Sequence, residues 1–178
     1  MYVKPINPPF FKPFSLILIT ITELAINTLI MLITKVYVGI VDSGIDNLHP
    51  DLSQNINTEL SADFTGGNSP WYVSGYHGTH VAGIVGARGG NSIGVAGVNW
   101  NISLVSLKVG DSAPSTDYVV AAVDYARTNN IPILNMSLSI NNTIALSNII
   151  QSYDGLIVCA AGNNWGIDID TNYIYPAS

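Results

Sequence analysis

From residue 36 onward, the sequence alternates between short apolar runs rich in β-branched residues and longer runs with helical periodicity. Parallel strands need crossover connections of about this length, and those connections are usually helices. The order therefore predicts an α/β fold with a central parallel sheet and helices on both faces. The expected strands are 36–41, 102–109, 131–138 and 156–161, and the expected helices are 77–87, 116–128 and 143–155.

Two local signals set the expected helix boundaries. The helix 116–128 is predicted to start at Ser115 or Thr116, which are favoured N-cap residues. The helix 143–155 is predicted to end at Gly155, because glycine commonly follows the last helical turn. A polar, glycine-containing loop is expected over 43–75.

The first 35 residues differ from the rest, which divides the chain into a leader, 1–35, and a domain, 36–178. Lysines and prolines precede the almost wholly apolar stretch 14–34, which is long enough to span a bilayer. We expect a hydrophobic leader or membrane-anchor-like segment, with membrane contact through 14–34 and an extracellular or membrane-anchored location. Glu23 and Asn27 interrupt the run. A helix packed on the domain or spurious sequence from a wrong start site therefore remain alternatives.

Length and charge restrict the function classes. The domain is long enough for one hydrophobic core. The net charge of −6 and the lack of any Lys/Arg cluster argue against a nucleic-acid partner. The single cysteine, Cys159, excludes an internal disulfide and is expected to be a buried core thiol.

Polar residues stand where two of the predicted strands end. Asp42 follows the first strand, and Asn163 follows the last one after the small residues Ala160, Ala161 and Gly162. Ligands of open parallel sheets bind beyond the carboxyl ends of the strands, so both residues are candidates for a functional site. Each on its own is also compatible with a simple turn residue.

Two of the three histidines, His77 and His80, lie three residues apart in GYHGTHVAGIVGA (75–87). They could share one helix face and bind a metal. A zinc hydrolase of the HExxH type also needs a glutamate base and a third ligand, whereas Gly78 and Thr79 stand between these histidines. The pattern favours a catalytic base at the start of a helix.

Together the motifs resemble the subtilisin-like serine protease family (peptidase S8 type) over residues 36–178. The matching stretches are VGIVDSGIDNLHPDL (38–52), GYHGTHVAGIVGA (75–87), ILNMSLS (133–139) and VCAAGNN (158–164). Their order along the chain is that of the family, in which the triad runs Asp, His, Ser. The resemblance implies a subtilisin-like α/β fold, proteolysis as the function and a peptide or protein as the substrate.

The resemblance also assigns residue roles. Asp42 would be the triad acid, His77 the general base and Asn163 the donor to the oxyanion, while His49 and His80 would be structural. The substrate-binding residues would be Ser137, Leu138, Ser139, Ala160, Ala161 and Gly162.

A calcium site is implied by the stretch GNSIGVAGV (90–98), which resembles the calcium loop of the family. The ligands would be the side chains of Asp51 and Asn91 and the carbonyls of Ile93 and Val95. No cofactor is required for the chemistry itself.

The family's Gly-Thr-Ser-Met-Ala type motif, which carries the nucleophile, does not occur in the sequence, which ends at Ser178. We therefore expect the N-terminal portion of a protease domain, with a fold incomplete at its C-terminus. The family function is serine endopeptidase, but the 178-residue chain alone is predicted to be inactive. A catalytically inactive fragment or peptide-binding pseudo-protease is the alternative. A phosphotransferase with Asp42 as nucleophile would need a second carboxylate where Gly44 stands.

Overall fold

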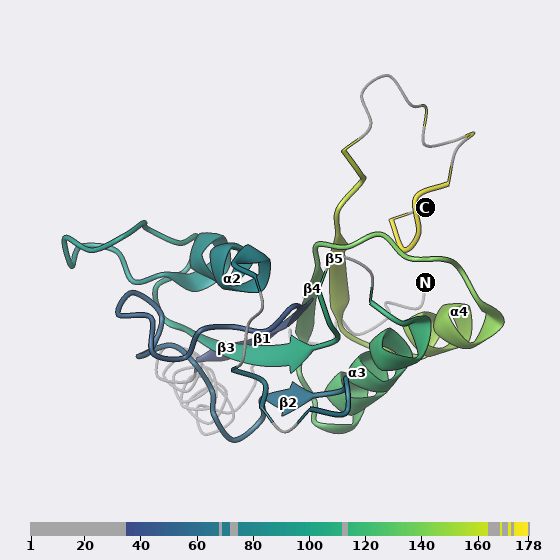
Figure 1. Ribbon diagram of the computed structural model, residues 1–178, viewed down its shortest axis with the longest axis horizontal. Coiled ribbons are helices and arrows are strands. Elements are labelled where there is room, and N and C mark those ends of the chain that lie inside the picture. Colours follow the sequence, from purple (N-terminus) through teal and green to yellow (C-terminus); the bar gives the residue numbers. More distant parts are fainter. Residues whose placement is uncertain are drawn as a thin grey trace, which may run out of the picture. The chain divides into compact units, whose positions relative to one another are not determined.

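The structure is a computed structural model that describes residues 35–67, 69–71, 75–111, 114–163, 168, 171 and 173–177 (Figure 1). The chain divides into two compact units, 1–35 and 36–178. The predicted leader, with its apolar stretch 14–34, lies outside the described residues except for Lys35. Among the helices that the structure describes, none has the length and hydropathy needed to cross a membrane.

Within the described part of residues 36–178, five strands form one sheet in the order β2-β3-β1-β4-β5, and every neighbouring pair is parallel. Strand β1 pairs with β3 from Val36↔Ile102 to Asp42↔Lys108. Every residue of β1 from Val38 onward is buried. The predicted α/β fold with a parallel central sheet is confirmed. The strands are β1 (Val36–Asp42), β2 (Ala62–Asp63), β3 (Ile102–Lys108), β4 (Ile133–Met136) and β5 (Leu156–Cys159).

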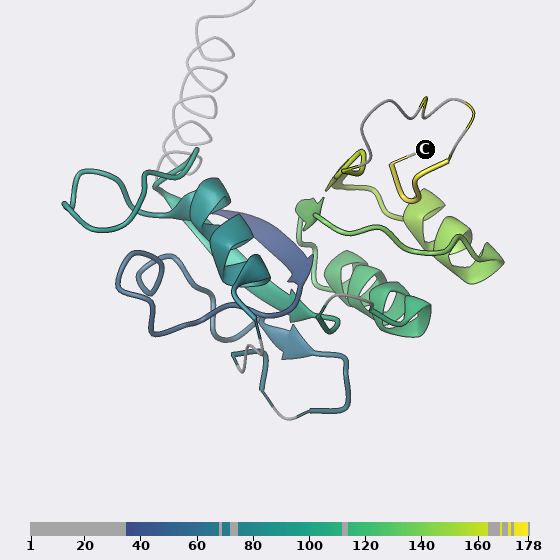
Figure 2. The ribbon, with the colours of Figure 1, turned by 45° about the horizontal axis from the view of Figure 1, so that its top comes forward.

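Helices cover both faces of this sheet, as the sequence predicts (Figure 2). On one face, Val38, Ile40 and Leu104 pack with Ala82 of α2. On the other, Val41 and Leu107 join a larger core with the helices α3 and α4. Successive side chains of a strand point to opposite faces, which explains this division. The helices are α2 (His77–Gly86), α3 (Thr116–Thr128) and α4 (Ile144–Gln151).

Gly39 makes the close packing around the central strand possible. A Cβ atom there would lie 2.5 Å from Leu134 Cδ2 and 2.9 Å from Leu107 Cδ1. Both leucines are fully buried, so neither can move without disturbing the core. The absence of a side chain at Gly39 therefore lets β1 lie in the middle of the sheet.

Several predicted boundaries were wrong, and β4 and β5 are both shorter than the strands expected over 131–138 and 156–161. The helix expected to end at Gly155 ends at Gln151, because the chain then turns to bury Tyr153, whose hydroxyl donates to the Ile131 carbonyl. Gly155 instead serves the turn into β5, since a Cβ there would lie 2.5 Å from the Pro132 carbonyl oxygen. The expected loop 43–75 also contains the short strand β2, which is too brief to show an alternating pattern.

Candidate active site

Asp42, the last residue of β1, lies on the α2 side of the sheet. Alternate residues of a strand point to the same face, so Asp42 shares a face with Val38 and Ile40. The side chains of Val38 and Ile40 pack with α2. Asp42 is only 5% exposed, and its Oδ1 accepts a 2.8 Å hydrogen bond from the backbone N–H of Ser43. The strand thus holds a carboxylate at its carboxyl end, aimed at the start of α2.

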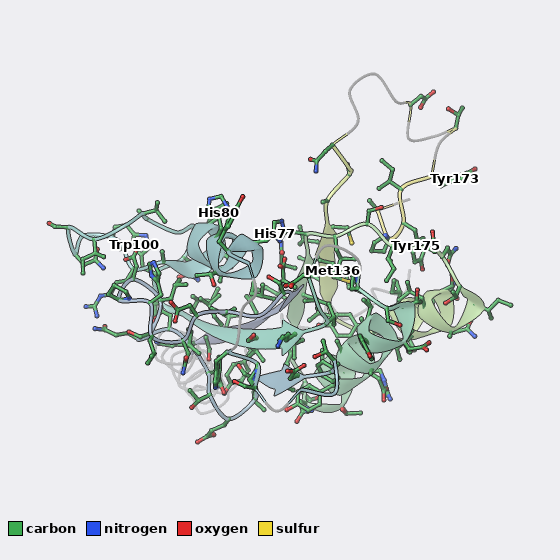
Figure 3. The ribbon with its side chains drawn as sticks, viewed as in Figure 1. His77, His80, Trp100, Met136, Tyr173 and Tyr175 are labelled. Carbon is green, nitrogen blue, oxygen red and sulfur yellow. The ribbon has the colours of Figure 1, made fainter. Side chains whose placement is uncertain are left out.

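His77, the first residue of α2, is in direct contact with that carboxylate. Its Nδ1 lies 2.8 Å from Asp42 Oδ1 and 3.0 Å from Asp42 Oδ2. Because a carboxylate only accepts, Nδ1–H is the donor and Nε2 carries the free lone pair. The His77 side chain is 58% exposed, and Figure 3 shows it at the end of α2 nearest the strand ends. The pair can accept a proton at Nε2 and stabilise the resulting imidazolium.

The start of α2 is fixed by contacts to the loop that follows Asp42. Gly78 donates its backbone N–H to Ser43 Oγ over 3.1 Å, and Thr79 Oγ1 accepts from the backbone N–H of Asp46 over 3.0 Å. A Cβ at Gly78 would lie 2.3 Å from the Gly44 carbonyl oxygen. This glycine therefore lets the helix approach closely enough for His77 to reach Asp42.

A cleft of about 580 Å³ opens beside this pair. Three of the predicted substrate-binding residues, Ser137, Leu138 and Ser139, line it, as the sequence predicts for the end of β4. The described residues that line it are Asp42, Ser43, Gly75, Tyr76, His77, Val109, Gly110, Asp111, Pro114, Ser137, Leu138 and Ser139.

The sequence predictions missed the wall formed by Val109, Gly110, Asp111 and Pro114. These residues lie at or just beyond the end of the predicted strand 102–109, a position that suits a site but does not by itself distinguish them from other loop residues. Their lack of a recognisable motif explains why they were overlooked. Tyr76, at the N-cap of α2, was also missed, although it lies within the stretch 75–87 that carries His77.

The described residues 160–163, which follow β5, do not line this cleft. Asn163 and the small residues Ala160, Ala161 and Gly162 are exposed, and they follow a strand of the same sheet edge. Gly162 has a φ of 96°, a conformation that glycine adopts readily. The structure thus places Asn163 beyond a strand end without bringing it into contact with His77.

Among the described residues, no hydroxyl or thiol forms a hydrogen bond with His77 Nε2. Ser43 Oγ accepts from Gly78, and Ser137 Oγ donates to Asn135 Oδ1 over 2.9 Å. Burial raises the pKa of the Cys159 thiol, which disfavours the reactive thiolate. The described residues therefore contain an acid–base pair without a hydroxyl held against it.

His80 lies one turn further along α2 and lines a different cavity, of about 530 Å³. His49 and Asp51 also line this cavity, and His49 Nδ1 accepts from the backbone N–H of Asp51 over 3.3 Å. Among the described residues, no group of three or more His, Cys, Asp and Glu side chains is arranged to hold a metal ion. This arrangement gives no support to zinc shared by the two α2 histidines.

Asp51 holds the 91–95 loop in place. Its Oδ1 accepts from Asn91 Nδ2 over 2.8 Å, and its Oδ2 accepts from the Val95 backbone N–H over 2.9 Å. These two hydrogen bonds, the Asn91 one foremost, hold the pKa of the Asp51 carboxyl below its ordinary value. A Cβ at Gly94 (φ 51°) would lie 2.4 Å from Asp51 Oδ2, so the loop is wrapped tightly around the carboxylate.

The residue types of this loop include those that calcium prefers, while the contacts that Ile93 and Val95 make here are those of their N–H groups. Calcium prefers carboxylate, amide and carbonyl oxygens, which are the groups that Asp51, Asn91, Ile93 and Val95 offer. Asn91 Oδ1 accepts from the Ile93 backbone N–H, while its nitrogen faces Asp51. Calcium binding would require the amide to turn its oxygen toward Asp51, which rotation about the Cβ–Cγ bond permits.

Comparison with protein families gives one extended match. The family described as the Subtilase family, peptidase S8, matches residues 34–178. Subtilisin E of Bacillus subtilis is 38% identical over 151 residues, which cover 81% of this chain and 38% of the relative. Subtilisin of Bacillus pumilus is likewise 38% identical, covering 81% of this chain and 53% of the relative.

Solved structures agree with this match. A cold-adapted subtilisin-like serine proteinase has a TM-score of 0.61 at 28% identity, covering 72% of this chain and 46% of that one. The S41 psychrophilic protease has a TM-score of 0.61 at 33% identity, with coverages of 73% and 46%. The chain thus spans about half or less of the length of these relatives.

Proposed function

Since the chain belongs to the subtilase family, whose members are serine proteases, we propose that residues 36–178 provide the acid–base half of an endopeptidase site. The contact between His77 Nδ1 and Asp42 Oδ1, at 2.8 Å beside an open cleft, carries this proposal. A buried carboxylate behind an exposed imidazole is the arrangement that activates a hydroxyl nucleophile.

In this mechanism, His77 Nε2 takes the proton of a serine hydroxyl as that oxygen attacks the peptide carbonyl. Asp42 keeps the proton on Nδ1 and stabilises the imidazolium that forms. His77 then gives the proton to the departing amine. Asn163, beyond the end of β5, is proposed to donate its side-chain N–H to the oxyanion, which requires the 160–163 segment to approach the cleft.

This mechanism needs a serine hydroxyl beside His77 Nε2, and none of the described residues places one there. We therefore propose that the 178-residue chain on its own does not hydrolyse peptides. Substrates would be peptides or proteins that lie along Ser137, Leu138 and Ser139, and along Ala160, Ala161 and Gly162 once the 160–163 segment approaches the cleft. Calcium bound at Asp51, Asn91, Ile93 and Val95 would stabilise the loop without taking part in the reaction.

The second candidate function is peptide binding without catalysis. The cleft could hold a peptide even though no described hydroxyl is bonded to His77 Nε2. A phosphotransferase is less compatible, because Asp42 is 5% exposed and its carboxylate is occupied by His77 and Ser43. The proposed location outside the cell or at the membrane depends on the stretch 14–34 alone.

A fluorogenic peptide assay on two proteins tests the proposal. The 178-residue chain should give no turnover, and a version extended with a family-like serine segment should hydrolyse the peptide. His77→Ala in the extended version should abolish that activity. Turnover by the short chain that a serine-directed phosphonate stops would contradict the proposal, as would an active extended version that tolerates His77→Ala.

A further inference from the structure

The position of Asp111 in the cleft is determined by the backbone that carries Asp42. Val109 is fully buried, and its N–H donates a 2.9 Å hydrogen bond to the Asp42 carbonyl oxygen. Only Gly110, with a φ of 111°, lies between Val109 and Asp111. This short, anchored connection places Asp111 in the lining of the same cleft as His77.

Asp111 differs from the other cleft carboxylate in being available to a ligand. Asp42 is buried and occupied by His77, whereas Asp111 is exposed. Within the part of the chain that the structure describes, the Asp111 carboxylate has no hydrogen-bond or ion-pair partner. A substrate side chain could therefore approach it without displacing a protein group.

The charges around the cleft favour a cation there. None of the described lining residues is a lysine or arginine. The nearest basic residue in sequence, Lys108 at the end of β3, has its Nζ 3.2 Å from Asp63 Oδ2 on the neighbouring strand β2. Field lines of one sign are focused in a cleft with protein walls, which strengthens the attraction for an opposite charge.

We propose that Asp111 selects peptide substrates that carry a lysine or arginine side chain over the 109–111 wall. The apolar stem of such a side chain would lie against Gly110 and Pro114, and its charged end would reach the Asp111 carboxylate. This inference rests on the proposed function, because it needs a peptide in the cleft. It adds a specificity-determining residue that the family motifs of this sequence do not contain.

Peptide binding to the 178-residue chain tests this proposal without requiring turnover. Calorimetry at low ionic strength measures the affinity of a neutral reference peptide and of a series of variants. In this series, lysine, norleucine or glutamate occupies each position of the peptide in turn. At one position, lysine should bind about two- to fivefold tighter than norleucine, the range of an exposed ion pair. The preference should disappear at about 1 M salt, where the Debye length is about 3 Å.

Variants assign the preference to the carboxylate. Asp111→Asn should remove it, Asp111→Glu should retain it, and Asp111→Lys should shift it to glutamate. Asp117→Asn, in the first turn of α3 and outside the cleft lining, is the matched control and should change nothing. A lysine preference that survives Asp111→Asn, or equal binding of all peptides, would overturn the proposal. If no peptide binds at all, the proposed function fails, and this inference fails with it.

Discussion

The backbone N–H of Gly78 donates a 3.1 Å hydrogen bond to the side-chain oxygen of Ser43, thirty-five residues earlier in the chain. This bond joins the first turn of α2 to the residue that directly follows Asp42. It therefore fixes the two halves of the acid–base pair relative to each other. The contact depends on the bare backbone of Gly78, where a Cβ would lie 2.3 Å from the Gly44 carbonyl oxygen.

Gly78→Ala should displace the start of α2 and lower the free energy of unfolding by about 1–3 kcal/mol, the usual cost of overpacking. Gly75→Ala is the matched control, because nothing lies within 4 Å of a Cβ built there. Urea denaturation measures both variants. Equal stability of the two variants would show that the close approach at Gly78 is not required.

Asp42→Asn should lower kcat of the serine-extended version by about 10⁴, because an asparagine favours the wrong tautomer of the histidine. The geometry should be retained, so KM should change little. Steady-state kinetics with a fluorogenic peptide checks both values. A loss confined to KM would mean that Asp42 acts in substrate binding instead of orienting His77.

How far the sequence predicts this site can be judged from individual residues. The Asp42–His77 contact was predictable, because the motifs around both residues resemble those that carry the paired acid and base of the subtilisin-like family, and both residues stand at predicted element ends. The wall at Asp111 was not, since a charged residue after a strand has no periodicity that distinguishes it from any loop residue. The end of α4 at Gln151 was also missed, because burial of Tyr153 outweighed the local signal of Gly155.

Asp51→Asn should destabilise the domain at neutral pH and not at strongly acidic pH. The folded pKa of Asp51 lies below its ordinary value of 3.8, so its contribution is present above that value and is lost as the pH falls through the folded pKa. Urea denaturation over a series of pH values measures this difference. Asp154→Asn, at an exposed position, is the control. If the free energy of unfolding of Asp51→Asn still differed from that of the parent chain at the lowest pH, the ionised Asp51 carboxylate would not be the cause of the difference.

Calcium should raise the melting temperature of residues 36–178 in proportion to the logarithm of its concentration above the dissociation constant. The shift should vanish in Asp51→Asn and weaken in Asn91→Ala, because these variants remove oxygen ligands. Magnesium is the control, since it demands shorter and more regular coordination. A melting temperature that calcium leaves unchanged would exclude this loop as the site.

The edge strand β5 should promote aggregation of the isolated chain. Leu156 is 59% exposed and Val158 is 46% exposed, and as alternate residues they share one face of the strand. Val158→Lys should reduce light scattering at raised temperature, since a charge on an edge strand opposes pairing between copies. Ile144→Lys, at an 83% exposed residue of α4, is the control. An equal effect of both substitutions would point to net charge instead of the strand edge.

The side-chain alternation of β1 has a consequence for how such a chain can vary. Asp42 faces α2 only because it stands an even number of residues after Val38 and Ile40, which pack on the same helix. Many substitutions along the strand would preserve this relation, whereas deletion or insertion of a single residue between Ile40 and Asp42 would turn the carboxylate to the opposite face. The acid's orientation is thus encoded in a residue count, which apolar substitutions at positions of β1 other than Gly39 preserve and a change in length does not.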